Sequence, residues 1–236
     1  MENPPYPCCR THAAGPVVHS PVPSLTQYAS PKLIRAIAYD GHDPADDPEW
    51  ARTGAPSQEE YGRWCRHLCG MVCLQMALTH RDGTAPPLWE LRDGALAAGA
   101  YTLDGDEIRG LIYRPFAEYA AAVHQMGAAV HPHMSMDDLE RATAAGRMAM
   151  VSVSKDIRTP DAEPARRGGH LVLVHGIDEQ GVRFLNPSGH TRESRKATLP
   201  PAAFERFFGG RGISLDLRPR DTGTPSGSSA PAPLAT

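Results

Sequence analysis

The hydrophobic pattern of the chain changes its period near residue 147. Before that point, four apolar stretches have helical spacing and are bounded by Pro, Gly or a capping Ser. They are Gly70–Thr79, Pro87–Ala98, Arg114–Gln125 and Ser135–Ala145. Gly70–Thr79 leaves hardly any polar face, so it predicts a buried helix. Ser135, with Asp138 three residues later, predicts an N-cap.

Beyond residue 147 the apolar residues form short aliphatic or β-branched runs separated by Gly, Pro and Asp turns, which is typical of strands. The runs are Met148–Ser154, His170–Ile177, Val182–Asn186 and Gly212–Leu217. We expect an antiparallel sheet in this half. Helices first and strands second predict an α+β fold in which a helix end faces a sheet edge across a cleft.

The polar and Pro-rich segments predict how the chain is organised. Residues 1–20 and 218–236 are rich in Pro and small residues, so we expect flexible ends around one folded unit, residues 21–217. Residues 40–60 (DGHDPADDPEWARTGAPSQEE) predict a polar surface insertion that is ordered only in part.

Composition excludes several classes of protein. The chain has 236 residues, 41% of them apolar, and a formal net charge of -3, with no basic stretch suited to nucleic acid. It has neither a signal-like N-terminus nor a run of 18 apolar residues, which argues against a membrane protein. Five cysteines form an odd set without disulfide-framework spacing, which favours free thiols in the cytoplasm.

Three residues of the sequence are of types that form catalytic sites. Cys69 precedes the predicted buried helix, His170 begins a predicted strand, and Asn186 ends the next one. A thiol, an imidazole and a carboxamide are the components of a Cys/His/Asn acyl-transfer site. A helix N-terminus and an imidazolium would lower the pKa of the thiol and supply thiolate.

Two other interpretations of the cysteines compete with catalysis. Cys65, Cys69 and Cys73 recur every four residues, as a zinc site or a buried row of thiols would. The zinc interpretation lacks a second ligand pair at short spacing, because His131 and His133 lie far away in sequence. We therefore expect no metal and no cofactor, with Cys73 in the core.

His170 and Asn186 also have ordinary alternatives. His170 and His175 lie on opposite faces of one strand, so only one of them can face the thiol. His170 follows two glycines at the strand mouth, whereas His175 is expected to be structural or exposed. Asn186 precedes Pro187 and could simply be a turn residue.

The order VPSLTQ, CGMVCLQMAL, GGHLVLVHGIDEQGVRFLNPSG and PAAFERFF resembles the bacteriocin-processing, double-glycine-leader family of papain-fold cysteine peptidases and its stand-alone relatives. The resemblance covers roughly residues 20–217. It implies a papain-like fold with Cys69 as nucleophile, His170 as general base and Asn186 as third member, where the family often has Asp.

The family's oxyanion-hole glutamine usually lies a few residues before the cysteine, where this chain has Arg63. The VP-x-x-x-Q context makes Gln27 the better candidate. The transporter-linked members' membrane segment and ATPase are absent from this sequence, so cleavage coupled to export is not implied.

The sequence therefore predicts a thiol hydrolase that forms an acyl-Cys69 intermediate from a peptide, amide or thioester. Transfer of the acyl group to an amine is the alternative within enzymes, and the loop between Lys155 and Gly169 could serve as the lid that this needs. An inactive peptide-binding module is the alternative from another class. The substrate, the acceptor and the oligomeric state are not specified.

Overall fold

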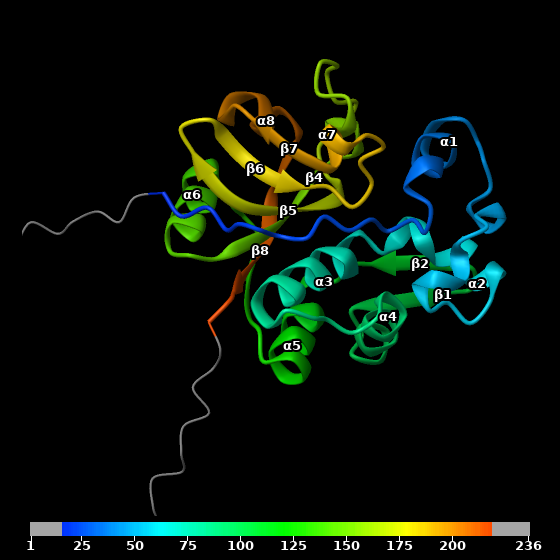
Figure 1. The fold of residues 1–236 in the computed structure, drawn as a ribbon. Coiled ribbons are helices and arrows are strands. Elements are labelled where there is room, and N and C mark those ends of the chain that lie inside the picture. The colour runs from blue at the N-terminus through cyan, green and yellow to red at the C-terminus, as the bar shows by residue number, and fades with distance from the viewer. Residues whose placement is uncertain (1–15, 219–236) are drawn as a thin grey trace, which may run out of the picture.

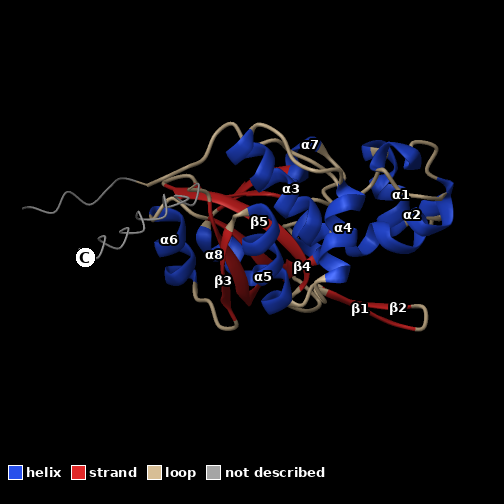
Figure 2. Cartoon of the chain, turned by 90° about the horizontal axis from the view of Figure 1, so that it is seen from below, coloured by secondary structure: helices blue, strands red, loops and turns tan. Residues whose placement is uncertain are grey.

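The computed structural model describes residues 16–218, in which a twisted six-stranded sheet lies beside a group of helices (Figure 1). The order of the sheet is β3-β8-β4-β5-β6-β7, and every neighbouring pair is antiparallel. β1 and β2 form a separate hairpin that projects from the rest of the chain (Figure 2). The predicted fold class, α+β with a helical N-terminal half packed on an antiparallel sheet, is confirmed.

The strands are β1 (Tyr101–Asp104), β2 (Glu107–Gly110), β3 (Gly127–His131), β4 (Met148–Ser154), β5 (Gly169–Asp178), β6 (Gly181–Leu185), β7 (Lys196–Leu199) and β8 (Phe208–Asp216). The α-helices are α1 (Ile34–Tyr39), α2 (Gln58–Trp64), α3 (Cys69–Asp82), α4 (Leu88–Ala97), α5 (Tyr113–His124), α6 (Met136–Ala144), α7 (Arg192–Arg195) and α8 (Pro201–Phe207). Among these described helices, none is long and apolar enough to cross a bilayer.

Both faces of the sheet are buried, which explains why its central strands are apolar at nearly every position. On β5, Leu171 and Leu173 belong to the core that contains α3, whereas Val172 and Val174 belong to a second core with α6 and α8. Alternate residues of a strand point to opposite faces, so two cores require two apolar rows.

Helix α3 is the central helix, and its position fixes Cys69 at its first residue. Seven of the side chains from Met71 to Leu78 are buried, as its uniform apolar pattern predicts. The helix begins one residue before the expected Gly70 and ends at Gly83, whose φ of 79° is left-handed. A methyl group on Gly70 would lie 2.8 Å from Leu111 and 3.2 Å from Leu171, so this residue lets two side chains pack against the helix start.

The other predicted helices and the four predicted strands are present, with ends shifted by a few residues. The sequence pattern did not predict strands β1, β2, β3 and β7 or the short helices α1, α2 and α7. The missed strands are four or five residues long and bury few large side chains, so they lack the alternation that identifies a strand.

The N-terminal segment runs along β5 before it reaches α1 (Figure 1). Val18 pairs with Gly176, and the His19 N–H donates to the His175 carbonyl at 2.9 Å. Ordered pairing thus begins before the predicted boundary at residue 21. The flexible ends predicted for residues 1–20 and 218–236 otherwise lie outside the described residues.

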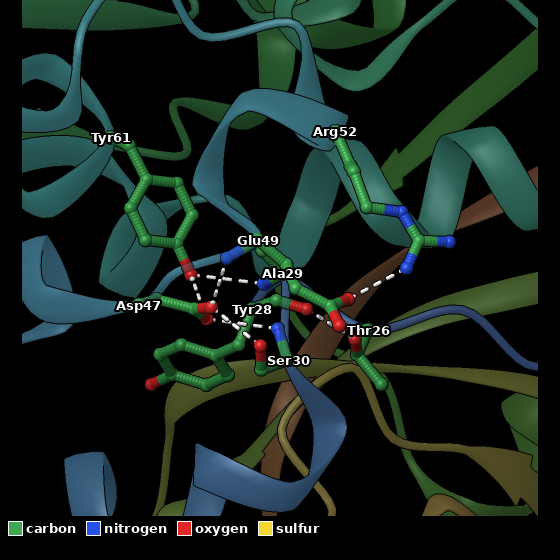
Figure 3. Close-up of polar contacts among 8 residues, drawn as sticks. All are labelled: Thr26, Tyr28, Ala29, Ser30, Asp47, Glu49, Arg52 and Tyr61. Carbon is green, nitrogen blue, oxygen red and sulfur yellow. Dashed lines mark hydrogen bonds and ion pairs between the residues drawn. The ribbon is translucent and has the colours of Figure 1, made fainter.

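The prediction for residues 40–60 is wrong in one respect, because this segment contains a fully buried carboxylate. Asp47 is 0% exposed and accepts hydrogen bonds from the backbone N–H and hydroxyl of Ser30, the Tyr61 hydroxyl and the Glu49 N–H (Figure 3). Burial alone would raise its pKa, but these bonds together hold the pKa below its usual value. Asp47 therefore connects Ser30 to Tyr61 of helix α2. The acidic composition of segment 40–60 concealed this role, since most of its charged residues are exposed.

We expect Asp47→Ala to destabilise the protein by about 3 kcal/mol, because it leaves several buried donors without an acceptor. Asp46→Ala, at the exposed neighbouring residue, is the control and should change stability by less than about 0.5 kcal/mol. Urea unfolding at pH 7 measures both. A carboxyl group whose pKa is lowered by folding stabilises the folded state at pH values above its unfolded-state pKa. This contribution disappears as the pH falls through its folded-state pKa. The difference between wild type and Asp47→Ala should therefore shrink in acid; a difference that does not change with pH would contradict this role for the carboxylate.

Candidate active site

Cys69 and His170 line the same small cavity, which has a volume of about 150 Å³. Cys69 is the first residue of α3 and His170 the second residue of β5, so the packing of α3 on β5 brings them together. The wall of the cavity also includes Leu111, Tyr113 and Arg211. The predicted meeting of a helix start and a strand mouth is thus present.

The imidazole of His170 is buried and oriented through one of its nitrogens. Its Nε2 lies 2.8 Å from Asn186 Oδ1 and 3.0 Å from Ser188 Oγ, and the residue is 4% exposed. Donation to the carboxamide oxygen requires the tautomer with the proton on Nε2, which leaves Nδ1 as an acceptor. Burial lowers the pKa of His170 to about 3, and the Arg158 guanidinium acts in the same direction. The ring is therefore neutral at neutral pH and able to accept a proton.

Asn186 is held by its own turn. Its backbone N–H donates to the Arg195 carbonyl at 2.8 Å, and its Oδ1 accepts the Ser188 N–H at 3.0 Å. The Asn-Pro-Ser-Gly turn thus supplies the ordinary turn bonds and also presents Oδ1 to His170. The turn interpretation and the orienting interpretation of Asn186 are compatible.

The thiol of Cys69 differs from the sequence-based expectation of a lowered pKa. Burial raises the pKa of Cys69, and the backbone N–H groups of Leu171 and Gly70 and the charge of Lys155 oppose that rise. The thiol and the imidazole of this cavity are therefore both uncharged at neutral pH.

Gln27 lies next to the segment that leads into α3, without lining the cavity itself. Its Nε2 donates to the Cys65 carbonyl at 2.8 Å, and its backbone N–H donates to the Pro187 carbonyl at 2.9 Å. Gln27 therefore contacts the turn that carries Asn186 through its backbone and the turn before Cys69 through its side chain, with one Nε2 hydrogen not used by these bonds. Arg63, the alternative candidate, bonds instead to the Gly105 carbonyl in the β1–β2 hairpin.

The remaining residues of the sequence-based hypotheses, Cys65, Cys73 and His175, occupy structural positions. Cys65 and Cys73 are 0% exposed, and burial raises the pKa of each, to about 12 for Cys65. His175 is buried, and its Nδ1 lies 3.0 Å from the His19 carbonyl oxygen. Within residues 16–218, no group of three or more His, Cys, Asp or Glu side chains is arranged to hold a metal ion.

Two residues beside the proposed triad, Arg158 and Ser188, were not predicted from the sequence. Arg158 is 8% exposed, and its Nε donates to Ser188 Oγ at 2.9 Å, while that hydroxyl donates to Asn186 Oδ1 at 3.2 Å. The turn sequence FLNPSG contained the signal for Ser188, two residues after Asn186. Nothing distinguished Arg158 from the exposed cations of its loop.

No family model and no curated protein sequence matches this chain. Among solved structures, the chain is similar to one described as a C39-like peptidase of Bacillus anthracis, with a TM-score of 0.46 and 17% sequence identity. The similarity covers 65% of this chain and 90% of that chain. The assignment of the site rests on the geometry of its own residues.

Proposed function

We propose that the protein is a papain-like cysteine peptidase or a related thiol hydrolase, which forms an acyl-Cys69 intermediate with a peptide, amide or thioester substrate. The observation that carries this proposal is the shared cavity of Cys69 and His170, together with the 2.8 Å contact from His170 Nε2 to Asn186 Oδ1. A purely structural cysteine and histidine would not need this arrangement.

In the proposed reaction, His170 Nδ1 accepts the proton of the Cys69 thiol while the sulfur forms a bond to the carbonyl carbon. Backbone N–H groups in the first turn of α3 have no partner within the helix, so the Cys69 N–H is available to the carbonyl oxygen as it becomes negative. Gln27 is the proposed second donor. The imidazolium then returns its proton to the leaving amine, alcohol or thiol, and a water molecule hydrolyses the acyl-enzyme with His170 as base.

The experiment that tests the proposal combines thiol labelling with analysis of products. Iodoacetamide at pH 6 should alkylate Cys69 ahead of Cys65 and Cys73, because of these three thiols Cys69 alone lines the cavity. Incubation with peptide and thioester acyl donors should add the mass of the acyl group to the wild-type protein and none to Cys69→Ser. Labelling of Cys73 first, or equal acylation of Cys69→Ser, would refute the assignment.

The same incubation distinguishes hydrolysis from transfer of the acyl group to an amine. A hydrolase releases free acid at a rate indifferent to added amine, whereas a transferase releases amide in proportion to it. We expect free acid to dominate. Amide as the main product at millimolar amine would replace hydrolase by acyltransferase and leave the roles of Cys69 and His170 unchanged.

A further inference from the structure

Positive side chains gather at the mouth of the active-site cavity. Arg211 lines the cavity together with Cys69 and His170. A methyl group on Gly168 would lie 3.0 Å from a guanidinium nitrogen of Arg211, and one on Gly169 would lie 3.5 Å from a guanidinium nitrogen of Arg166. The two arginines therefore lie against adjacent glycines at the strand mouth that leads to His170.

Lys155 is the third member of this group. It begins the turn after β4 and follows Ser154, which pairs with Gly169 at the start of β5. Burial and then the charges of Arg158, Arg166 and Arg66 lower the pKa of Lys155, whereas Cys69 raises it. The residue before Lys155 thus lies beside the glycine before His170, which places the lysine at the same strand mouth as the two arginines.

These three cations lack anionic partners in the described chain. Within residues 16–218, no carboxylate oxygen lies within 4.0 Å of Lys155, Arg166 or Arg211, although fourteen ion pairs form elsewhere. The cavity wall contains no Asp or Glu. Asp156, next to Lys155, instead accepts hydrogen bonds from the Ser154 hydroxyl at 3.0 Å and the Ala165 N–H at 3.1 Å.

We propose that Lys155, Arg166 and Arg211 bind a carboxylate of the substrate, close in sequence to the acyl carbon that Cys69 attacks. This inference rests on the proposed function and specifies its substrate class as acidic peptides or acyl donors. A cavity of about 150 Å³ holds only a small group, so the carboxylate lies at the rim, where all three side chains are exposed. Guanidinium groups bind carboxylates through paired, charge-assisted hydrogen bonds, and a cationic rim also raises the local concentration of an anionic substrate.

The first test compares two small reagents that differ in charge. Iodoacetate carries a carboxylate where iodoacetamide carries an amide, and each alkylates a thiol at the neighbouring carbon. We expect the ratio of their rate constants at Cys69 to exceed the ratio for free cysteine by about tenfold at low salt, and to fall as salt is added. A ratio equal to that of free cysteine would overturn the proposal.

Substitutions of exposed arginines identify which cations cause the preference for iodoacetate. The double change Arg166→Gln and Arg211→Gln should bring the iodoacetate-to-iodoacetamide rate ratio at Cys69 to within about twofold of that for free cysteine. The electrostatic attraction of iodoacetate increases with the positive charge at the cavity mouth, and the double change removes two of these charges. Arg52→Gln removes an exposed arginine that lies in the 50–53 turn and pairs with Glu49, so it should leave the ratio unchanged. Equal effects of the double change and of Arg52→Gln would refute a local site.

A binding measurement separates this proposal from the catalytic one, because it needs no reactive thiol. On the Cys69→Ser protein, N-acetylglutamic acid α-amide, its isomer N-acetylglutamine and the uncharged N-acetylglutamine amide are titrated while the amide signals of Gly168 and Gly169 are followed by NMR. Shifts with N-acetylglutamic acid α-amide would indicate that the site binds a side-chain carboxylate, and shifts with N-acetylglutamine that it binds a terminal carboxylate. If neither isomer bound more tightly than the neutral amide, the proposal would be overturned. If the protein bound the carboxylate but the wild-type Cys69 were unreactive, the carboxylate site would be supported and the peptidase-like chemistry refuted.

Discussion

Replacing His170 with alanine is expected to reduce turnover by several orders of magnitude, up to about 10⁶-fold, because the thiol loses its proton acceptor. Asn186→Ala should be roughly a hundredfold less severe, since it disturbs only the orientation and tautomer of the ring. Steady-state kinetics with the acyl donor found by mass analysis, together with urea unfolding of each variant, measures these effects.

His175→Gln is the matched control for this pair, because His175 lies on the same strand and is also buried. It should keep near-normal turnover even if it lowers stability. A fully active His170→Ala protein, or an inactive but folded His175→Gln protein, would remove His170 from the proposed site.

A pH profile gives an independent measurement of the same role. The pKa of His170 is lowered to about 3, chiefly by burial, so the ring should remain a competent base well below the ordinary titration range of histidine. We expect the acid limb of kcat/KM in the wild type to lie below pH 5. An acid limb near pH 6.5 would show that the catalytic base is a solvated histidine and not His170.

The sequence was most informative where one local pattern determined one structural feature. The uniform apolar run after Cys69 could be satisfied only by a helix buried on all sides, and the aliphatic run after His170 only by a strand covered on both faces. Packing of these two elements brings the thiol and the imidazole to one cavity, so their juxtaposition followed from order along the chain.

The sequence was least informative where residues distant in the chain meet. Asp47 resembled the exposed acids around it, and only the tertiary contact with Ser30 and Tyr61 makes it a buried anchor. Arg158 was likewise hidden among exposed loop cations, although it bonds to Ser188 thirty residues later. The direction of the Cys69 pKa shift was predicted wrongly for a related reason. The helix N-terminus, which lowers the pKa of a thiol, could be recognised from the sequence, but the burial that raises it could not.

Gln27→Ala should reduce acyl-transfer turnover by about 10²-fold to 10³-fold, the usual cost of removing one oxyanion donor. The observed bond from Gln27 Nε2 to the Cys65 carbonyl offers a different explanation for the same loss, because the side chain could simply position the turn before Cys69.

Alkylation separates the two explanations, since displacement of iodide by the thiol forms no oxyanion, whereas acylation does. If Gln27 donates to the oxyanion, Gln27→Ala should lose acyl transfer while its rate of reaction with iodoacetamide at Cys69 stays within about twofold of wild type. If Gln27 only positions the turn, both rates should fall together. Arg63→Gln is the matched control, because Arg63 bonds to the β1–β2 hairpin and should leave both rates near normal. An inactive Arg63→Gln protein beside an active Gln27→Ala protein would transfer the role to Arg63.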